Sequence, residues 1–293
     1  MTVAEKFKAF CSNISIDKDT RDLIRSRKGQ IAKRLNRDFW GTSSEDQHLI
    51  YVGSYGRRTE TEVSDIDLLF VLPPRDYDKY SGRKYNGQSD LLQDVKNSLA
   101  STYPNTRMRG DGQVVVVSFS DEMTFEILPA FKCTDGTYLY PDTHNGGSWK
   151  MTNPQAEIDE ITRMNKQTCY NLKRLCKMAR AWRDQNNVDI KGIQIDILAY
   201  EFLKGWEYNQ CSYVLYNYMS YFFFEHLSRC PIDKKYWFIP GSNRFVVYEN
   251  RFTSKAKEAR LLSSKALNYA KLGNYAEENK LWREIYGSKF PKY

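Results

Sequence analysis

Two aspartates and one glutamate are the residues of this sequence whose types and spacing could bind metal ions. Asp65 and Asp67 are two residues apart at the start of an apolar run, and Glu126 lies in a second apolar run. In a β-strand, residues two apart point to the same side, so the aspartates would share one face while Ile66 and Leu68 enter the core. Adjacent carboxylates repel each other unless a cation lies between them.

Carboxylate oxygens favour Mg²⁺ or Mn²⁺, which bind through a few carboxylates plus substrate phosphates. Two such ions about 3.5–4 Å apart can activate a sugar hydroxyl and stabilise a leaving pyrophosphate. We therefore predict that Asp65 and Asp67 bridge two Mg²⁺ ions, with Mn²⁺ as the alternative. Glu126 would complete the ion nearer the attacking hydroxyl. The alternatives are a plain surface pair of aspartates and a Glu126 that is merely exposed on a wet face of the sheet.

A glycine and a serine precede the aspartates by about a dozen residues. Gly53 allows backbone N–H groups to approach a phosphate closely, and the Ser54 hydroxyl adds one more donor. Alone, this dipeptide indicates only a turn. Next to the paired aspartates, it predicts that Gly53 and Ser54 bind substrate phosphate.

Strands joined by short turns must position these groups. The patterns predict strands over residues 48–52, 66–72, 114–119 and 123–128, and helices over residues 3–39 and 91–99. Residues 74–87 are polar and predict a surface loop. Helices before and after a group of strands are typical of an α+β lobe.

From residue 153 onward the pattern is almost entirely helical. The longest predicted helix covers residues 155–185, and others cover 193–208, 213–227, 253–272 and 275–286. We expect residues 1–150 to form the first lobe together with its N-terminal helices, and residues 151–293 to form a helical lobe.

Composition limits the partners and the compartment. A net charge of +8 and an aromatic content of 14% suit nucleotides or nucleic acid, although solubility alone could explain the charge. The six cysteines form no CxxC pair and do not cluster with the three histidines, which argues against a zinc site. The apparent lack of a signal peptide and of a long apolar segment predicts a cytoplasmic protein with no membrane contact.

The order of these motifs resembles that of the polymerase-β nucleotidyltransferase superfamily. The longer sequence motifs that contain them resemble those of the bacterial cGAS/DncV-like nucleotidyltransferases, or CD-NTases of the SMODS type. The motifs that are similar are GSYGRRT at 53–59, SDID at 64–67, ILPAF at 127–131, GSW at 147–149, TNP at 152–154, KGIQID at 191–196 and the ending at 282–291. They span nearly the whole chain.

The resemblance implies a polymerase-β-like lobe with a mixed sheet, backed by an all-helical C-terminal lobe, with the active site in the groove between them. It also implies template-independent synthesis of a cyclic di- or trinucleotide second messenger from ATP and GTP or another nucleoside triphosphate, in bacterial anti-phage (CBASS) signalling with a separate effector protein. Lys177 matches a lysine that reaches the triphosphate in relatives. Arg57 and Asn165 are further candidate substrate contacts, with solvated positions as the alternative.

Two departures qualify the match. The third carboxylate is commonly Asp where this chain has Glu126, and a Ser often stands where this chain has Gly192. The chain also lacks the Cys and His set of the zinc module with which animal relatives grip double-stranded DNA, so we expect no dependence on such DNA. A linear transferase acting on RNA or protein, and an inactive nucleotide-binding scaffold, remain alternative functions.

Overall fold

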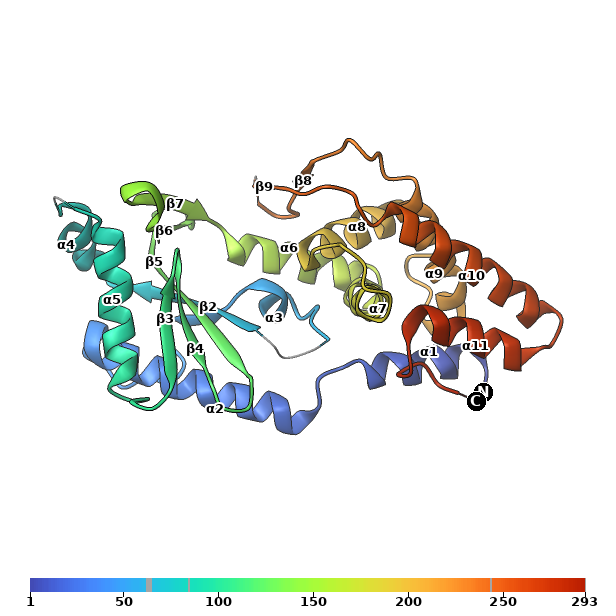
Figure 1. Cartoon of the computed structure of the whole chain (residues 1–293), viewed down its shortest axis with the longest axis horizontal. Helices are drawn as coiled ribbons and strands as arrows, with labels where there is room; N and C mark the ends of the chain where they lie inside the picture. Colours follow the sequence, from blue (N-terminus) through green and yellow to red (C-terminus); the bar gives the residue numbers. More distant parts are fainter. Residues whose placement is uncertain (62–64, 84, 243, 293) are drawn as a thin grey trace. The chain divides into compact units, whose positions relative to one another are not determined.

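The computed structural model describes residues 1–61, 65–83, 85–242 and 244–292 (Figure 1). Ser64, which is part of the motif around the aspartates, lies outside the described residues. The chain divides into two compact units. The sheet unit consists of Ile16–Gly56 and Val63–Gln155, and the helical unit consists of Met1–Ser15, Arg57–Glu62 and Ala156–Tyr293.

This division differs from the predicted one at 150/151. The boundary falls at residues 155–156, and the first fifteen residues belong to the helical unit rather than to the nucleotidyltransferase core. The reason is packing: Phe7 and Phe10 on helix α1 (Val3–Asn13) are fully buried, and both rings contact Phe290. Aromatic burial of this kind dominates the energetics of a core.

The described residues of the sheet unit form a seven-stranded mixed sheet in which β2 and β5 are parallel neighbours and the other pairs are antiparallel. The main path runs β1-β2-β5-β4-β3, and β6 pairs with both β5 and β7. The strands are β1 (Leu49–Tyr51), β2 (Asp65–Leu72), β3 (Arg107–Asp111), β4 (Val114–Ser118), β5 (Thr124–Lys132), β6 (Tyr138–Asp142) and β7 (Ser148–Thr152). The predicted α+β fold is therefore confirmed.

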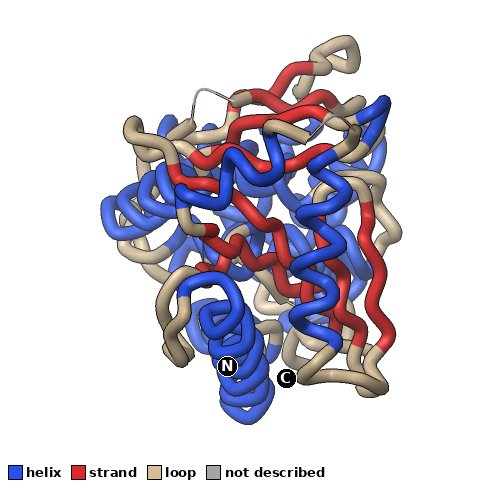
Figure 2. The backbone as a smooth tube through the Cα atoms, turned by 90° about the vertical axis from the view of Figure 1, so that its left-hand side faces the viewer, coloured by secondary structure: helices blue, strands red, loops and turns tan. Residues whose placement is uncertain are grey.

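Helices α2 (Lys18–Leu35) and α5 (Gly87–Ala100) supply the main core of this unit by packing on one face of the sheet (Figure 2). The apolar positions of both helices recur at helical spacing, which produces the buried stripe. A π-helix (Asn36–Trp40) extends α2, and the predicted loop at 74–87 contains a 3₁₀ turn (Pro74–Asp76) and the short helix α4 (Tyr77–Ser81). Helix α3 (Gly53–Arg57) follows β1, and a second 3₁₀ turn covers His144–Gly146.

Among the described residues, the helical unit has its own core, formed by α1 and six longer helices. These are α6 (Pro154–Gln167), α7 (Asn171–Gln185), α8 (Gly192–Gly205), α9 (Tyr216–Ser228), α10 (Thr253–Lys271) and α11 (Tyr275–Tyr286). A 3₁₀ turn (Tyr213–Leu215) precedes α9, and β8 (Tyr236–Phe238) pairs with β9 (Phe245–Val247). The single helix predicted over 155–185 is thus two helices, α6 and α7. Among the described helices, none combines the length and apolarity that crossing a bilayer requires.

Candidate active site

Strands β2 and β5 place the three predicted carboxylates on one face of the sheet. In the parallel register Asp67 is the partner of Glu126, and Asp65 is the partner of Thr124. Paired residues on neighbouring strands point to the same side, and so do residues two apart on one strand. The prediction that the three carboxylates share a face is therefore confirmed.

The opposite face of β2 enters the core, as the alternating sequence predicted. Ile66 is 1% exposed and Leu68 is 0% exposed, whereas Asp65 is exposed and Asp67 is half-buried. Glu126 is half-buried between the fully buried Phe125 and Ile127. The alternation anchors both strands through their apolar side chains and leaves the carboxylates accessible.

The Gly53-Ser54 segment lies against Asp67. The N–H of Val52 donates a hydrogen bond to the backbone oxygen of Asp67 at 2.9 Å. Gly53 has a φ of +60°, and a Cβ at this position would overlap the Asp67 carboxylate and lie 2.9 Å from its Cβ. Only glycine fits this combination of left-handed backbone and close approach. The segment therefore borders the carboxylate face, where we predicted a phosphate contact for Gly53 and Ser54.

Neighbouring carboxylates change the pKa of Glu126. The pKa of Glu126 is raised above its ordinary value by burial first, and then by the charges of Asp67, Asp65 and Asp111. Arg109 acts in the opposite direction and lowers it. A cation among these oxygens would remove the repulsion.

Arg109 and Asp111 are neighbours of this face that sequence reasoning missed. They lie on β3, where their side chains form an exposed ion pair at 3.2 Å. Arg109 pairs with Val116 on β4, and Val116 in turn pairs with Glu126 on β5. Little in the sequence indicated that residues 107–111 form a strand, because β3 lacks the apolar alternation that is typical of one.

The donor set fits a magnesium ion that shares its coordination with substrate. In the part of the chain that the structure describes, no three His, Cys, Asp or Glu side chains are gathered into a ready-made metal cage. Mg²⁺ does not require one, since it usually binds through one or two carboxylates, water and substrate phosphates. Two register-paired carboxylates with a third nearby on the same face match that requirement.

Arg57 is placed differently from the prediction. It is 6% exposed, and its Nε donates to the Asp196 carboxylate at 3.0 Å. The same carboxylate accepts a hydrogen bond from Arg180 at 2.7 Å and another from the Thr59 hydroxyl at 3.0 Å. Arg57 is therefore held in a buried ion-pair network, and we no longer assign it to substrate phosphate.

Asn165 is buried rather than solvated, and its side chain has a structural partner. Its Oδ1 accepts a hydrogen bond from the backbone N–H of Lys173 at 2.9 Å, which joins the end of α6 to the start of α7. Lys177, on α7, has its Nζ 3.6 Å from a carboxylate oxygen of Glu60. Both residues line a groove of the helical unit, whereas Gly53, Ser54 and the three carboxylates belong to the sheet unit.

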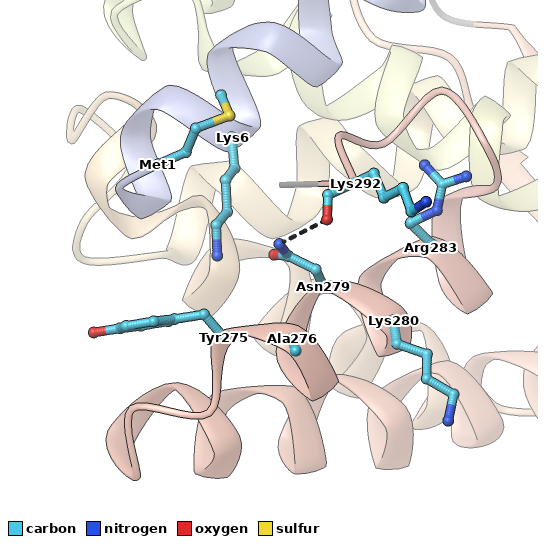
Figure 3. A pocket seen from close by; sticks show the side chains of 8 residues that line it. All are labelled: Met1, Lys6, Tyr275, Ala276, Asn279, Lys280, Arg283 and Lys292. Carbon is cyan, nitrogen blue, oxygen red and sulfur yellow. Dashed lines mark hydrogen bonds between the residues drawn. The ribbon is translucent and has the colours of Figure 1, made fainter.

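A different cavity of the helical unit, of about 540 Å³, lies beside α1 and α11 (Figure 3). Lys6 is buried there in an ion pair with Glu278 at 2.8 Å, and the Asn279 amide donates to the backbone oxygen of Lys292 at 3.3 Å. It shares no residue with the predicted site.

Comparison with known proteins agrees with the geometry. Residues 1–165 match the family model of the Second Messenger Oligonucleotide or Dinucleotide Synthetase domain. The chain is 24% identical over 308 residues to the cyclic AMP-AMP-AMP synthase of Acinetobacter sp. (strain ATCC 27244 / 9458), across 100% of this chain and 86% of that protein.

Solved structures show the same fold at lower identity. The E. coli MS115-1 CdnC:HORMA-deltaN complex matches with a TM-score of 0.72 and 16% identity, covering 98% of both chains. Vibrio cholerae DncV in its apo form matches with a TM-score of 0.64 and 15% identity, covering 83% of this chain and 69% of that one. Since the family model spans more than half of the sequence, the chain belongs to the Second Messenger Oligonucleotide or Dinucleotide Synthetase family and is a nucleotidyltransferase.

Proposed function

We propose that this nucleotidyltransferase joins nucleoside triphosphates into a cyclic di- or trinucleotide, releases pyrophosphate and depends on Mg²⁺. One observation supports the proposal above all: the parallel register that pairs Asp67 with Glu126 and sets Asp65 on the same face, beside Gly53. Family membership supports the class of product.

In the proposed reaction, bound Mg²⁺ supplies charge neutralisation for the phosphates and the developing alkoxide. Asp65 and Asp67 would hold the ions, with Glu126 completing the one nearer the attacking hydroxyl. As a carboxylate beside that hydroxyl, Glu126 would also be a candidate acceptor for its proton. The Gly53-Ser54 segment would bind the triphosphate through its backbone N–H groups and the Ser54 hydroxyl.

ATP is the first substrate to test, because the Acinetobacter relative is named for a product made only of AMP units. Structures of relatives with ATP and with GTP favour nucleoside triphosphates as the substrate class. We further propose that the product is a second messenger in bacterial anti-phage signalling, made in the cytoplasm without double-stranded DNA and sensed by a separate effector protein.

The test is incubation of the purified chain with radiolabelled nucleoside triphosphates and Mg²⁺, followed by phosphatase treatment and mass spectrometry. A small phosphatase-resistant product is expected, and replacing Asp65 and Asp67 together by Asn should abolish it while circular dichroism stays unchanged. Asp19→Asn with Asp22→Asn on the exposed side of α2 is the matched control and should synthesise normally.

Persisting synthesis in the Asp65→Asn and Asp67→Asn variant would refute the metal assignment. Labelled products that form only when RNA or protein is added would refute cyclic synthesis and indicate a linear transferase instead.

A further inference from the structure

A buried carboxylate of the helical unit accepts hydrogen bonds from the end of α3. This carboxylate is that of Asp196, on α8. Its Oδ2 accepts from the Nε of Arg57 at 3.0 Å and from the Thr59 hydroxyl at 3.0 Å. Its Oδ1 accepts from the Nη1 of Arg180 at 2.7 Å. Since Arg57 is the last residue of α3, Asp196 binds the chain at the point where this helix ends.

The backbone at the end of α3 brings two donors to the same carboxylate. Arg58, between Arg57 and Thr59, has a left-handed backbone with a φ of +58°. A bulky residue keeps this conformation where its surroundings enforce it, and such residues cluster at functional sites. Arg57 and Thr59 are both buried, so their hydrogen bonds to Asp196 are shielded from water.

Net stability does not explain this group of buried charges. Burial raises the pKa of Asp196, but Arg180 and Arg57 outweigh burial and hold the pKa below its ordinary value. Buried ion pairs are often no more stabilising than apolar side chains of the same volume, because desolvation offsets their attraction. A second carboxylate, that of Glu157, lies 3.9 Å from the Arg57 guanidinium. The network is better explained by the position that it imposes on Arg57.

The network also includes the position at which this chain departs from related sequences, where Gly192 stands in place of a common Ser. The Nη2 of Arg180 donates to the backbone oxygen of Gly192 at 3.0 Å. A Cβ at Gly192 would lie 3.2 Å from that nitrogen, so a Ser would crowd the guanidinium. The glycine therefore leaves room for Arg180 to bind Asp196.

The anchored residue and the predicted phosphate contact lie at opposite ends of one short helix. Helix α3 has five residues, too few for its internal hydrogen bonds to make it stable alone. At its start, the Gly56 N–H donates to the backbone oxygen of Val52 at 2.8 Å, and the Val52 N–H donates to that of Asp67 at 2.9 Å. At its end, Arg57 is bound by Asp196. The position of α3 is therefore set by contacts at both of its ends.

We propose that Asp196 is a positioning residue of the triphosphate site. It holds Arg57 and Thr59 and thereby fixes α3. The Gly53-Ser54 segment, with which α3 begins, is then kept where it can bind the triphosphate. This inference rests on the proposed function, and it assigns no contact between Asp196 and substrate.

The test is isothermal titration calorimetry of the purified chain with α,β-methylene-ATP and Mg²⁺, combined with hydrogen exchange at the amides of residues 53–57. Thr59→Val removes one hydrogen bond to Asp196 and keeps every charge. Its Kd should rise about 2- to 10-fold, the range that one hydrogen bond is worth. Asp196→Asn should raise the Kd further, and the amides should exchange faster in both variants. A loss of folded protein would lower the number of binding sites but not change the Kd, so the Kd reports on positioning.

Glu278→Gln is the matched control for Asp196→Asn. Both carboxylates are 1% exposed, but Glu278 binds Lys6 of α1, at 2.8 Å, rather than a residue of α3. This variant should unfold at a lower temperature and keep the Kd within about twofold of the parent, because distant sites act independently.

An unchanged Kd in Asp196→Asn would overturn the proposal, and so would an equal rise in Glu278→Gln or a parent that does not bind the analogue. If Asp196→Asn does not fold, the Kd of Thr59→Val decides alone. A parent that binds the analogue but forms no cyclic product would refute the proposed function instead, and weaker binding by the variants would still support the role of Asp196.

Discussion

At the scale of single residues, the Asp67 carboxylate depends on the absence of a side chain at position 53. The Cα of Gly53 occupies the space beside Asp67, and its left-handed backbone sets the direction in which α3 starts. The spacing of Asp65 and Asp67 made their shared face predictable. Arg57 was misjudged because its partner, Asp196, is 139 positions away in the sequence, and no local pattern reveals a pairing of that kind.

Gly53→Ala should abolish synthesis, because the added methyl must displace the Asp67 carboxylate. Gly41→Ala is the control: Gly41 has a similar φ of +69° but no atom within 4 Å of an added Cβ. Both variants should lose about 1–2 kcal/mol of unfolding free energy from the left-handed backbone. Product formation and urea denaturation measured on both would separate the two effects, and an active Gly53→Ala enzyme would contradict the role of this contact.

Glu126→Gln should abolish synthesis and yet stabilise the metal-free protein at pH values above the folded pKa of Glu126. The folded pKa of Glu126 lies above its unfolded value, so the native state binds the extra proton, and stability falls as pH rises through the window between the two values. The Gln variant cannot ionise and so does not lose unfolding free energy in this way. The difference should stay below about 1 kcal/mol because Glu126 is half-exposed. Thermal unfolding from pH 4 to 8, with and without Mg²⁺, is the measurement. Mg²⁺ should stabilise the parent more than the variant, and an equal shift in both would argue against coordination by Glu126.

At the scale of elements, the break between α6 and α7 is the main departure from the predicted secondary structure. Residues 155–185 have a continuous helical pattern with neither Gly nor Pro, so nothing local marks an end. The break is held instead by side chains: the Thr168 hydroxyl donates to the backbone oxygen of Met164, and it also accepts from the N–H of Leu172 at 3.3 Å. Tertiary contacts add to these local bonds: the Asn171 amide donates to the backbone oxygens of Asn209 and Cys211, and contacts of this kind override a local helical preference.

Asn165→Ala should destabilise this junction without altering catalysis directly. The Lys173 N–H would lose its acceptor, at a cost of about 1–3 kcal/mol in unfolding free energy. The KM for ATP should change less than about twofold, because the Asn165 acceptor is already occupied. Asn268→Ala, an exposed position on α10, is the control and should be neutral. A KM increase at normal stability would restore the prediction that Asn165 reads a base.

At the scale of the whole molecule, the described residues contain separate cores for the two units. The class of fold and the strands of the site were predictable because their apolar alternation is local. The assignment of residues 1–15 to the helical unit was not predictable, since the residues that they pack against lie near the other end of the sequence. Strands β6 to β9 were also missed, because they are short and follow no clear alternation.

Phe125→Ala and Leu198→Ala should each cost about 2–5 kcal/mol, since both side chains are fully buried in different cores. Hydrogen exchange should show loss of protection in the sheet unit for the first variant and in the helical unit for the second. Leu261→Ala, on an exposed face of α10, should cost much less. Equal loss of protection in both units from either substitution would show that they unfold as one.

The pairing of Lys6 with Glu278 spans 272 positions of sequence, and the ring of Phe7 lies 5.4 Å from that of Trp282. During translation α1 therefore leaves the ribosome long before the helices that bury it. Until α11 has been synthesised, the aromatic face of α1 cannot be buried against it. The nascent chain must therefore keep α1 able to dock onto α11 at a late stage of folding. A recombinant fragment that begins at residue 151 would lack this helix and should expose the apolar surface that α1 covers.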